Sequence, residues 1–171
     1  MKTVILGPLP HELEQLIERR RALGQDGLDE VWDGAYHVAA DVHFRHGFLA
    51  NEVMTLLKPF GQAVGLIAST GFNLGGENDF RVPDGGLHRE YVDAFYLDTA
   101  AMVIEVRSPD DETYEKLPFY AAHGVEEVLV TEPEEQRVRI FVLGADGYEE
   151  QGRSVLVGLD SFVMEAAISW R

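Results

Sequence analysis

Apolar residues follow helical spacing in two long parts of the chain. Over residues 10–23 this spacing, followed by Gly24, predicts an amphipathic helix. A second helix is predicted over residues 44–60, and Pro59 and Gly61 are expected to mark its end. The side chains expected on its buried face are Leu49, Val53, Leu56, Leu57 and Phe60.

Runs of β-favouring residues fill most of the remaining chain. Asp33-Gly34 stands between two such runs and predicts a hairpin with a tight turn of type I′. Further strands are expected at residues 66–70, 72–74, 79–82, 94–97, 127–131, 137–143 and within 147–157. The strongest run, residues 101–107, is nearly continuous in apolar residues, as is typical of a strand covered on both faces. Helices interleaved with strands, followed by a strand-rich C-terminal part, predict an α/β or α+β fold around one central sheet.

Composition supports a globular chain and restricts its chemistry. The chain has 171 residues, 46% of them hydrophobic, and no linker or repeat, so one domain over residues 1–171 is expected. The absence of cysteine excludes disulfides, thiolate catalysis and cysteine-held zinc, and it agrees with a cytoplasmic location. No apolar run reaches the roughly 20 residues of a membrane span, and the apolar stretch in residues 1–6 is too short for a signal peptide.

Charge argues against strong, unassisted binding to nucleic acid. The chain carries 14 lysines and arginines against 30 acidic residues, a formal net charge of −16, and it has no basic tail. Affinity for nucleic acid rests largely on neutralised phosphates, so DNA should bind weakly unless a basic patch or a metal reverses the field. One group of glutamates is expected to form a solubilising edge, with a DNA-mimicking surface as the alternative. The group is Glu126, Glu127, Glu132, Glu134 and Glu135.

Glu105 lies inside the strongest apolar run, where an ionised carboxylate is costly unless it is paired, hydrogen-bonded or bound to a metal. Side chains alternate along a strand, so Glu105 shares a face with Val103 and Arg107. An internal ion pair, or a strand end that emerges into water, would explain Glu105 equally well.

Asp84 is the natural partner of Glu105. It follows Pro83 at the end of a predicted strand, and Gly85-Gly86 is expected to open the chain after it. The 20 residues between Asp84 and Glu105 leave enough chain to turn and return beside it. Two carboxylates, a backbone carbonyl and waters make the oxygen-rich site that Mg²⁺ or Mn²⁺ prefers.

Lys116 brings a cation to the same region. It is one of three lysines in the chain and lies ahead of a short predicted helix. That helix is expected to begin near Leu117, with Pro118 in its first turn, and to end near His123-Gly124. Lys116 would then stand at the entrance of the helix.

Several blocks of residues, in a fixed order, carry a family resemblance. They are Glu30-Val31-Trp32-Asp33-Gly34, His46, Val82-Pro83-Asp84, Glu105-Val106-Arg107-Ser108-Pro109, Lys116, Tyr120, Gly124-Val125 and Glu127-Val128-Leu129-Val130. Together they resemble the Uma-two family of restriction-endonuclease-like proteins, in the PD-(D/E)xK nuclease superfamily. The resemblance covers residues 28–132 and implies a central mixed sheet flanked by helices.

The resemblance also implies roles for individual residues. Asp84 and Glu105, with the backbone carbonyl of Val106, would hold Mg²⁺ or Mn²⁺ as cofactor. The superfamily places a lysine two residues after the acidic ligand, where this chain has Arg107, and Lys116 matches the lysine that the family supplies from the next segment. Water activation is then expected from Lys116 with the metal. Charge stabilisation on the phosphate is expected from Arg107, which stays protonated and cannot act as a base.

Two more residues match the family. Glu30 is a candidate third carboxylate, although an exposed acid on a hairpin is an equally good explanation. His46 is expected to line the cleft, although a helix-face histidine is the simpler interpretation. His43 and His46 are three residues apart, but no further ligand at suitable spacing completes a zinc site.

The implied reaction is metal-assisted hydrolysis of phosphodiester bonds in nucleic acid, with DNA as the first expectation, by a cytoplasmic homodimer. The alternative is a catalytically inactive protein that keeps the fold and acts as a dimeric binding or assembly module. The net charge and Arg107 at the usual lysine position favour this alternative. An open cleft rimmed by Arg81, Arg89 or Arg107 would favour the enzyme, and a closed or acid-rimmed pocket the module.

Overall fold

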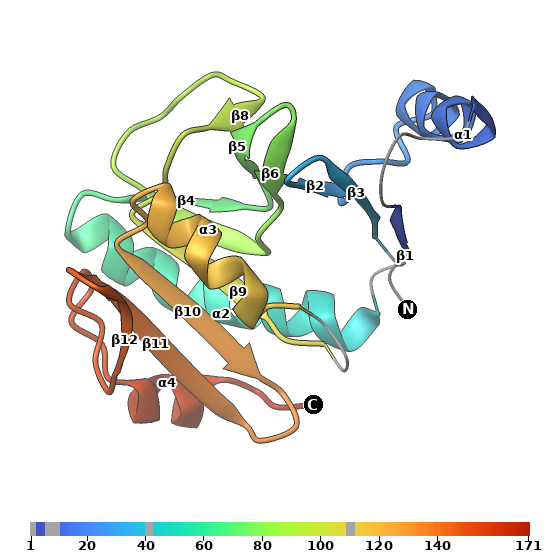
Figure 1. Ribbon diagram of the computed structural model, residues 1–171. Helices are drawn as coiled ribbons and strands as arrows, with labels where there is room; N and C mark the ends of the chain where they lie inside the picture. Colours follow the sequence, from blue (N-terminus) through green and yellow to red (C-terminus); the bar gives the residue numbers. More distant parts are fainter. Residues whose placement is uncertain (1–2, 6–10, 40–42, 109–111) are drawn as a thin grey trace.

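The computed structural model describes residues 3–5, 11–39, 43–108 and 112–171, which form two six-stranded sheets and four α-helices (Figure 1). Pro109 and the start of the first predicted helix, Pro10, lie outside the described residues, as do residues 1–2 and 6 of the apolar N-terminal stretch. The helices are α1 (His11–Ala22), α2 (Phe44–Ala63), α3 (Leu117–Ala122) and α4 (Ser161–Ala167), and the 3₁₀ turn η1 (Tyr114–Lys116) leads into α3.

One sheet, here called the β9 sheet, is mixed and has the strand order β12-β11-β10-β9-β7-β4. Its strands are β4 (Ile67–Thr70), β7 (Gly85–His88), β9 (Met102–Val106), β10 (Glu127–Glu132), β11 (Arg137–Gly144) and β12 (Gly147–Gln151). The neighbours β9 and β10 are parallel, while the other pairs are antiparallel. The C-terminal ends of β9 and β10 therefore meet at one end of the sheet.

The second sheet, here called the β2 sheet, has the order β1-β3-β2-β6-β5-β8. Its strands are β1 (Thr3–Ile5), β2 (Glu30–Trp32), β3 (Ala35–Val38), β5 (Asn73–Gly76), β6 (Asp79–Arg81) and β8 (Tyr96–Leu97). The predicted hairpin is confirmed, and Asp33 and Gly34 both have the positive φ angles, 47° and 82°, of a type I′ turn. The expectation of a single sheet is wrong, because periodicity places strands in the sequence and does not say which strands pair.

Helices cover both faces of the β9 sheet, which confirms the central mixed sheet flanked by helices. On one face, α2 and α4 pack against alternate β9 residues that include Met102, Ile104 and Val106. On the other face, Tyr120 of α3 packs against Val103 of β9. Figure 1 shows α3 in front of the sheet and α2 behind it. The side chains of β9 therefore alternate between two cores, as its sequence predicts.

Helix α2 continues beyond its predicted end. Pro59 lies inside the helix, which ends at Ala63, and Phe60 is 39% exposed, whereas Met54 is buried. A Cβ atom on Gly61 would lie 3.0 Å from Cδ2 of Leu87, so this glycine lets α2 pass close to β7. Packing against the sheet thus outweighs the hydrogen bond that proline removes.

The predicted opening at Gly85-Gly86 is wrong, because both glycines belong to β7, a buried strand that pairs with β9. A Cβ on Gly85 would lie 2.5 Å from Sδ of Met54, and one on Gly86 would lie 2.8 Å from the carbonyl oxygen of Met102. Glycine is therefore required here for close packing between a helix and two strands.

Two of the five glutamates expected on a solubilising edge are buried instead. Glu127 is 1% exposed and accepts hydrogen bonds from the hydroxyl of Ser154 and the backbone N–H groups of Val155 and Leu156. Glu132, 3% exposed, is part of the site described below. These acids contribute to the fold rather than to a charged surface.

The structure adds one helix that the sequence pattern did not predict. Helix α4 has seven residues and buries Met164 against the same core as α2. Its Glu165 accepts a hydrogen bond from the N–H of Val138 in β11 at 3.0 Å. Among the described helices, none has the length and apolar character needed to cross a membrane.

Candidate metal-dependent active site

Asp84 lies in the short connection between β6 and β7, at the end of the sheet where β9 ends. Its Oδ2 accepts a hydrogen bond of 2.7 Å from the backbone N–H of Val106, the residue directly after Glu105. Its Oδ1 lies 2.7 Å from Nε2 of His46, in the first turn of α2. Asp84 therefore lies beside Glu105, as expected from the sequence. The chain leaves Asp84 through strand β7 and not through a turn.

Glu105 is 4% exposed and belongs to a buried polar cluster. Lys116 donates from Nζ to Oε1 of Glu105 at 3.0 Å and to Oε1 of Glu30 at 2.8 Å. The hydroxyl of Tyr120, from α3, also donates to Oε1 of Glu105. Glu30 accepts two more hydrogen bonds, from the N–H of Val82 at 2.9 Å and from the indole N–H of Trp32 at 2.6 Å. Glu30 is thus no exposed hairpin acid but a partner of Lys116.

Local structure explains how Lys116 reaches this cluster. The 3₁₀ turn η1 ends at Lys116, α3 begins at Leu117, and Pro118 lies in its first turn, as predicted. Pro118 needs no N–H there, because the first N–H groups of a helix have no partner within it. Tyr120 follows four residues after Lys116, so one helical turn brings both side chains to Glu105.

Burial and charge act together on the protonation of the cluster. Burial raises the pKa of Glu105 to about 7, and Asp84 and Glu30 add to this, while Lys116 and the Tyr120 hydroxyl oppose it. Burial alone would lower the pKa of Lys116, but the carboxylates of Glu105 and Glu30 raise it above its usual value. Burial, followed by the charge of Glu105, raises the pKa of Tyr120. Lys116 is therefore held as an ammonium group at neutral pH.

The three arginines considered as a rim are each engaged with carboxylates. Arg81 is buried, donates to Asp79 and stacks between the rings of Trp32 and Phe119. Arg89 forms an exposed ion pair with Glu126.

Arg107 points to a different carboxylate from Glu105. Its Nη1 lies 3.7 Å from Oε1 of Glu132, and its guanidinium lies over the ring of Tyr114. Glu132 also pairs with Arg139 at 3.3 Å and accepts from the Tyr114 hydroxyl. The Arg107 side chain is 40% exposed, so it remains accessible beside the end of β9.

The donor atoms present suit a hard divalent cation. Asp84 and Glu105 offer carboxylate oxygens, and the carbonyl of Val106 should leave its strand on the side of its N–H, toward Asp84. Among the described residues, no three or more acidic and histidine side chains are grouped closely enough to hold an ion. Mg²⁺ commonly uses one or two carboxylates and completes its shell with waters and substrate phosphates, so this donor set fits it.

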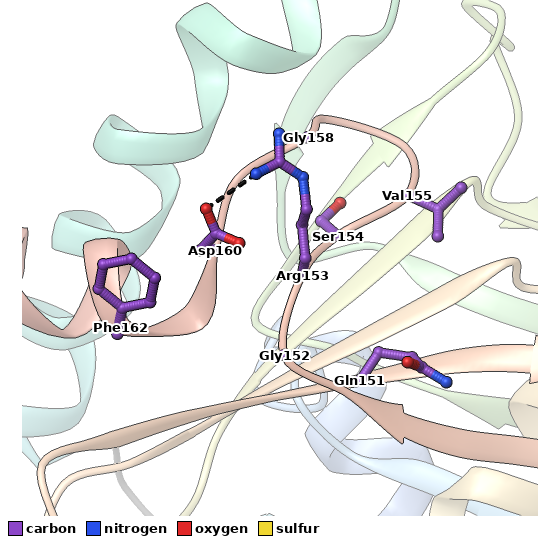
Figure 2. Close-up of a pocket in the computed structure, with 8 residues that line it drawn as sticks. All are labelled: Gln151, Gly152, Arg153, Ser154, Val155, Gly158, Asp160 and Phe162. Atoms are coloured by element: carbon purple, nitrogen blue, oxygen red, sulfur yellow. Dashed lines mark hydrogen bonds and ion pairs between the residues drawn. The ribbon is translucent and has the colours of Figure 1, made fainter.

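Two surface cavities lie away from these residues. The larger, about 610 Å³, surrounds the loop between β12 and α4, where Figure 2 shows Arg153 bonded to Asp160. The other, about 530 Å³, lies beside β4 and β5. Neither includes Asp84, Glu105 or Lys116, of which the last two are buried. The Asp84 side of the site is more accessible, because the side chains of Asp84 and His46 are each 22% exposed.

Comparison with protein families gives a clear result. A family model described as "Putative restriction endonuclease" matches residues 12–170. The chain belongs to this family, Uma2. The match extends the resemblance from residues 28–132 to nearly the whole chain, and it confirms the family identified from the sequence.

Solved structures support the fold of this Uma2 chain. A crystal structure described as "a putative nuclease belonging to DUF820", from Anabaena variabilis, has a TM-score of 0.66 and 14% sequence identity. The similarity covers 81% of this chain and 90% of that chain. A search of curated proteins finds no match. At this identity the likeness establishes a shared fold.

Tyr120, Trp32 and Ser108 belong to the sequence blocks that carry the family resemblance, but no role in the site was predicted for them. Tyr120 packs in an apolar core and Trp32 stacks against His37 and Arg81, yet their O–H and N–H groups donate to Glu105 and Glu30. A signal was available, because a buried tyrosine or tryptophan normally needs an acceptor and a buried glutamate needs donors. Ser108, whose Oγ lies 3.0 Å from Nδ1 of His46, carries no such signal.

Proposed function

We propose that this Uma2 protein is a metal-dependent nuclease that hydrolyses phosphodiester bonds in nucleic acid. One observation carries the proposal. Asp84 lies against the N–H of the residue that follows Glu105, so two acids 21 positions apart meet at the end of the β9 sheet. Membership of a family described as putative restriction endonucleases supports the same reaction class.

Each residue has a distinct role in this proposal. Asp84, Glu105 and the carbonyl of Val106 would hold Mg²⁺ or Mn²⁺, which when bound would lower the pKa of the attacking water. Lys116 anchors the Glu105 carboxylate through Nζ, and Glu30 anchors Lys116. The carboxylates of Glu105 and Glu30 raise the pKa of Lys116, so Lys116 contributes positive charge beside the attacking water that it would help to activate with the metal.

Besides Lys116, positive charge comes from Arg107 and Arg45, which are adjacent in sequence to residues of the site. Arg107 follows Val106, and Arg45 precedes His46 and bonds Glu134 and the carbonyl of Pro133. A phosphate would compete with Glu132 and Glu134 for these guanidinium groups. Once bound to the phosphate, Arg107 would stabilise the negative charge that develops in hydrolysis. Such competition gives weak, salt-sensitive binding, in keeping with a net charge of −16.

A cleavage assay tests the proposal. Purified protein is incubated with Mn²⁺ or Mg²⁺ and a panel of duplex DNA, single-stranded DNA and RNA, beside Glu105→Gln and Asp84→Asn. Glu115→Gln is the matched control, because Glu115 is an exposed acid in η1, adjacent to Lys116. Loss of cleavage in the first two variants, and retention in Glu115→Gln, is expected. Equal cleavage by wild type and Glu105→Gln would assign the activity to a contaminant.

A non-catalytic binding module is the second candidate. Burial of Glu105 and Lys116, the carboxylate partners of all three rim arginines and the overall acidity favour it. A protein that binds no divalent ion and cleaves nothing in the panel, while it retains a stable fold, would identify this module.

We also propose a cytoplasmic homodimer, on the reasoning that nucleases which cut both strands of a duplex commonly act as two-fold pairs. The absence of cysteine in the chain agrees with a reducing compartment. Light scattering coupled to size-exclusion chromatography would measure the mass, and a value near 19.1 kDa, the monomer mass, would contradict the dimer.

A further inference from the structure

We propose that His46 is a positioning residue that orients the carboxylate of Asp84, and that Ser108 in turn fixes the imidazole ring of His46. The inference rests on the proposed function, since it assigns a task to two residues beside a proposed metal ligand. It concerns a series of hydrogen bonds that joins α2, the connection between β6 and β7, and the segment after β9.

The chain of contacts is short and connects distant segments. Nε2 of His46, in the first turn of α2, lies 2.7 Å from Oδ1 of Asp84, in the β6–β7 connection. Nδ1 of the same ring lies 3.0 Å from Oγ of Ser108, which follows β9. Oδ2 of Asp84 accepts from the N–H of Val106, two residues before Ser108. The contacts form a closed loop, so Asp84 is held at both oxygens.

The hydrogen-bonding properties of Asp84, His46 and Ser108 determine which nitrogen of the imidazole ring carries the proton. An ionised carboxylate can only accept hydrogen bonds, so the contact between His46 and Asp84 requires a proton on Nε2. In the neutral ring, Nδ1 is then an acceptor, and the hydroxyl of Ser108 donates to it. Ser108 thereby favours the tautomer that Asp84 requires.

This arrangement explains why Asp84 needs external support. Asp84 lies between strands β6 and β7 rather than within one, so the sheet does not fix its side chain. Each Asp84 oxygen uses one lone pair for its present contact and retains another for a metal ion. Residues that orient metal ligands in this way typically change metal affinity by roughly 10- to 100-fold when they are removed.

The position of His46 indicates that it orients Asp84 and does not contribute to a hydrophobic core. Its side chain is 22% exposed and is not among the buried residues of either core around the β9 sheet. Loss of the ring should therefore affect metal binding far more than unfolding. Both ring nitrogens already contact protein atoms, which fits a ring that orients a ligand better than one that binds the ion itself.

Mn²⁺ affinity, measured by isothermal titration calorimetry, tests the proposal with four variants. His46→Leu removes the ring contacts with Asp84 and Ser108, His46→Gln keeps a donor near the position of Nε2, and Ser108→Ala removes the hydroxyl that contacts Nδ1. His43→Ser is the matched control, because it removes an exposed histidine three residues away but keeps a side chain able to cap α2. Thermal unfolding of each variant is measured in parallel.

We expect the Mn²⁺ dissociation constant of His46→Leu to rise roughly 10- to 100-fold, while its melting temperature stays close to that of wild type. His46→Gln should recover most of the affinity, Ser108→Ala should lose roughly three-fold, and His43→Ser should match wild type. In the double variant His46→Leu/Ser108→Ala, the serine change should add nothing further. Equal losses in His46→Gln and His46→Leu would overturn the proposal, because they would make the imidazole itself a ligand. Unchanged affinity in His46→Leu would overturn it as well.

A second readout needs no metal and no activity. In the metal-free protein, nitrogen NMR of the imidazole ring should show His46 protonated at Nε2, and Ser108→Ala should reduce this preference. A proton on Nδ1 alone would overturn the proposal. Wild-type protein that binds no Mn²⁺ but shows the expected tautomer would contradict the nuclease function and still support the positioning of Asp84 by His46.

Discussion

Replacement of Lys116 by methionine should strongly destabilise the protein, because Lys116 is the cation of a buried cluster with two carboxylates. Its Nζ lies 2.8 Å from Glu30 and 3.0 Å from Glu105, and all three residues are less than 10% exposed. Removal of one partner from a buried ion pair costs about 3–5 kcal/mol, since it leaves uncompensated charge in the interior. Glu105 limits the loss, because its pKa of about 7 lets it take up a proton when the ammonium is gone.

The expected destabilisation at pH 7 is therefore near the lower end of that range, about 3 kcal/mol. For a chain of this size, such a change lowers the melting temperature by roughly 6–12 °C. Circular dichroism melts and urea unfolding of Lys116→Met measure it. Lys58→Met is the matched control, since Lys58 is exposed on α2 and its loss should stay within about 0.5 kcal/mol.

A double-mutant cycle locates the effect. In Lys116→Met/Glu105→Gln the buried acid is neutral, so the added cost of losing the lysine should fall by at least about 1 kcal/mol. Equal melting temperatures for Lys116→Met and Lys58→Met would show that the buried cation adds no stability. Strict additivity in the cycle would contradict an interaction between Lys116 and Glu105.

Three further predictions concern other parts of the fold. Burial lowers the pKa of His88, which is hydrogen-bonded to Ser69, so the unfolded chain binds the proton more readily than the folded one. The free energy of unfolding should therefore fall as pH drops below about 6.5. In urea titrations, His88→Asn should lose part of this dependence of stability on pH. A wild-type slope retained in full by His88→Asn would contradict this. Gly86→Ala should cost about 1–3 kcal/mol or more, since its Cβ would collide with the Met102 carbonyl, and an unchanged unfolding midpoint would show that β7 is not packed as described. Glu127→Gln should lower the melting temperature by several degrees, because in the wild type one oxygen of the Glu127 carboxylate accepts two backbone N–H groups. Hydrogen exchange at Val155 and Leu156 should accelerate in the variant. Protection that persists at both amides would count against that role.

Local patterns in the sequence predict much of the fold. The Asp33-Gly34 turn and the Pro118 helix start are determined by backbone conformations that few residues favour, so they can be recognised without tertiary information. The alternation of β9 between two cores follows from its apolar run. The second sheet, the burial of β7 and helix α4 depend on which segments pack together, and no local pattern records that.

The candidate site shows the same division. Asp84 and Glu105 were predicted to meet, and their contacts through Val106 agree with this. The partner of Arg107 was not predictable, because Glu132 comes from β10 and reaches it only through the parallel pairing of β9 and β10. Glu30 likewise meets Lys116 across 86 positions of the chain, a contact that depends on how the two sheets are placed.

The proposed metal site is tested most directly by a Mn²⁺ titration of wild type and Glu105→Gln, monitored by calorimetry or by the electron paramagnetic resonance of the free ion. Saturable binding by the folded wild type and none by the folded variant is expected, because Glu105 would supply one of the two carboxylates of the site. Equal binding by both proteins, or no binding by either, would contradict a divalent-cation site built on Asp84 and Glu105.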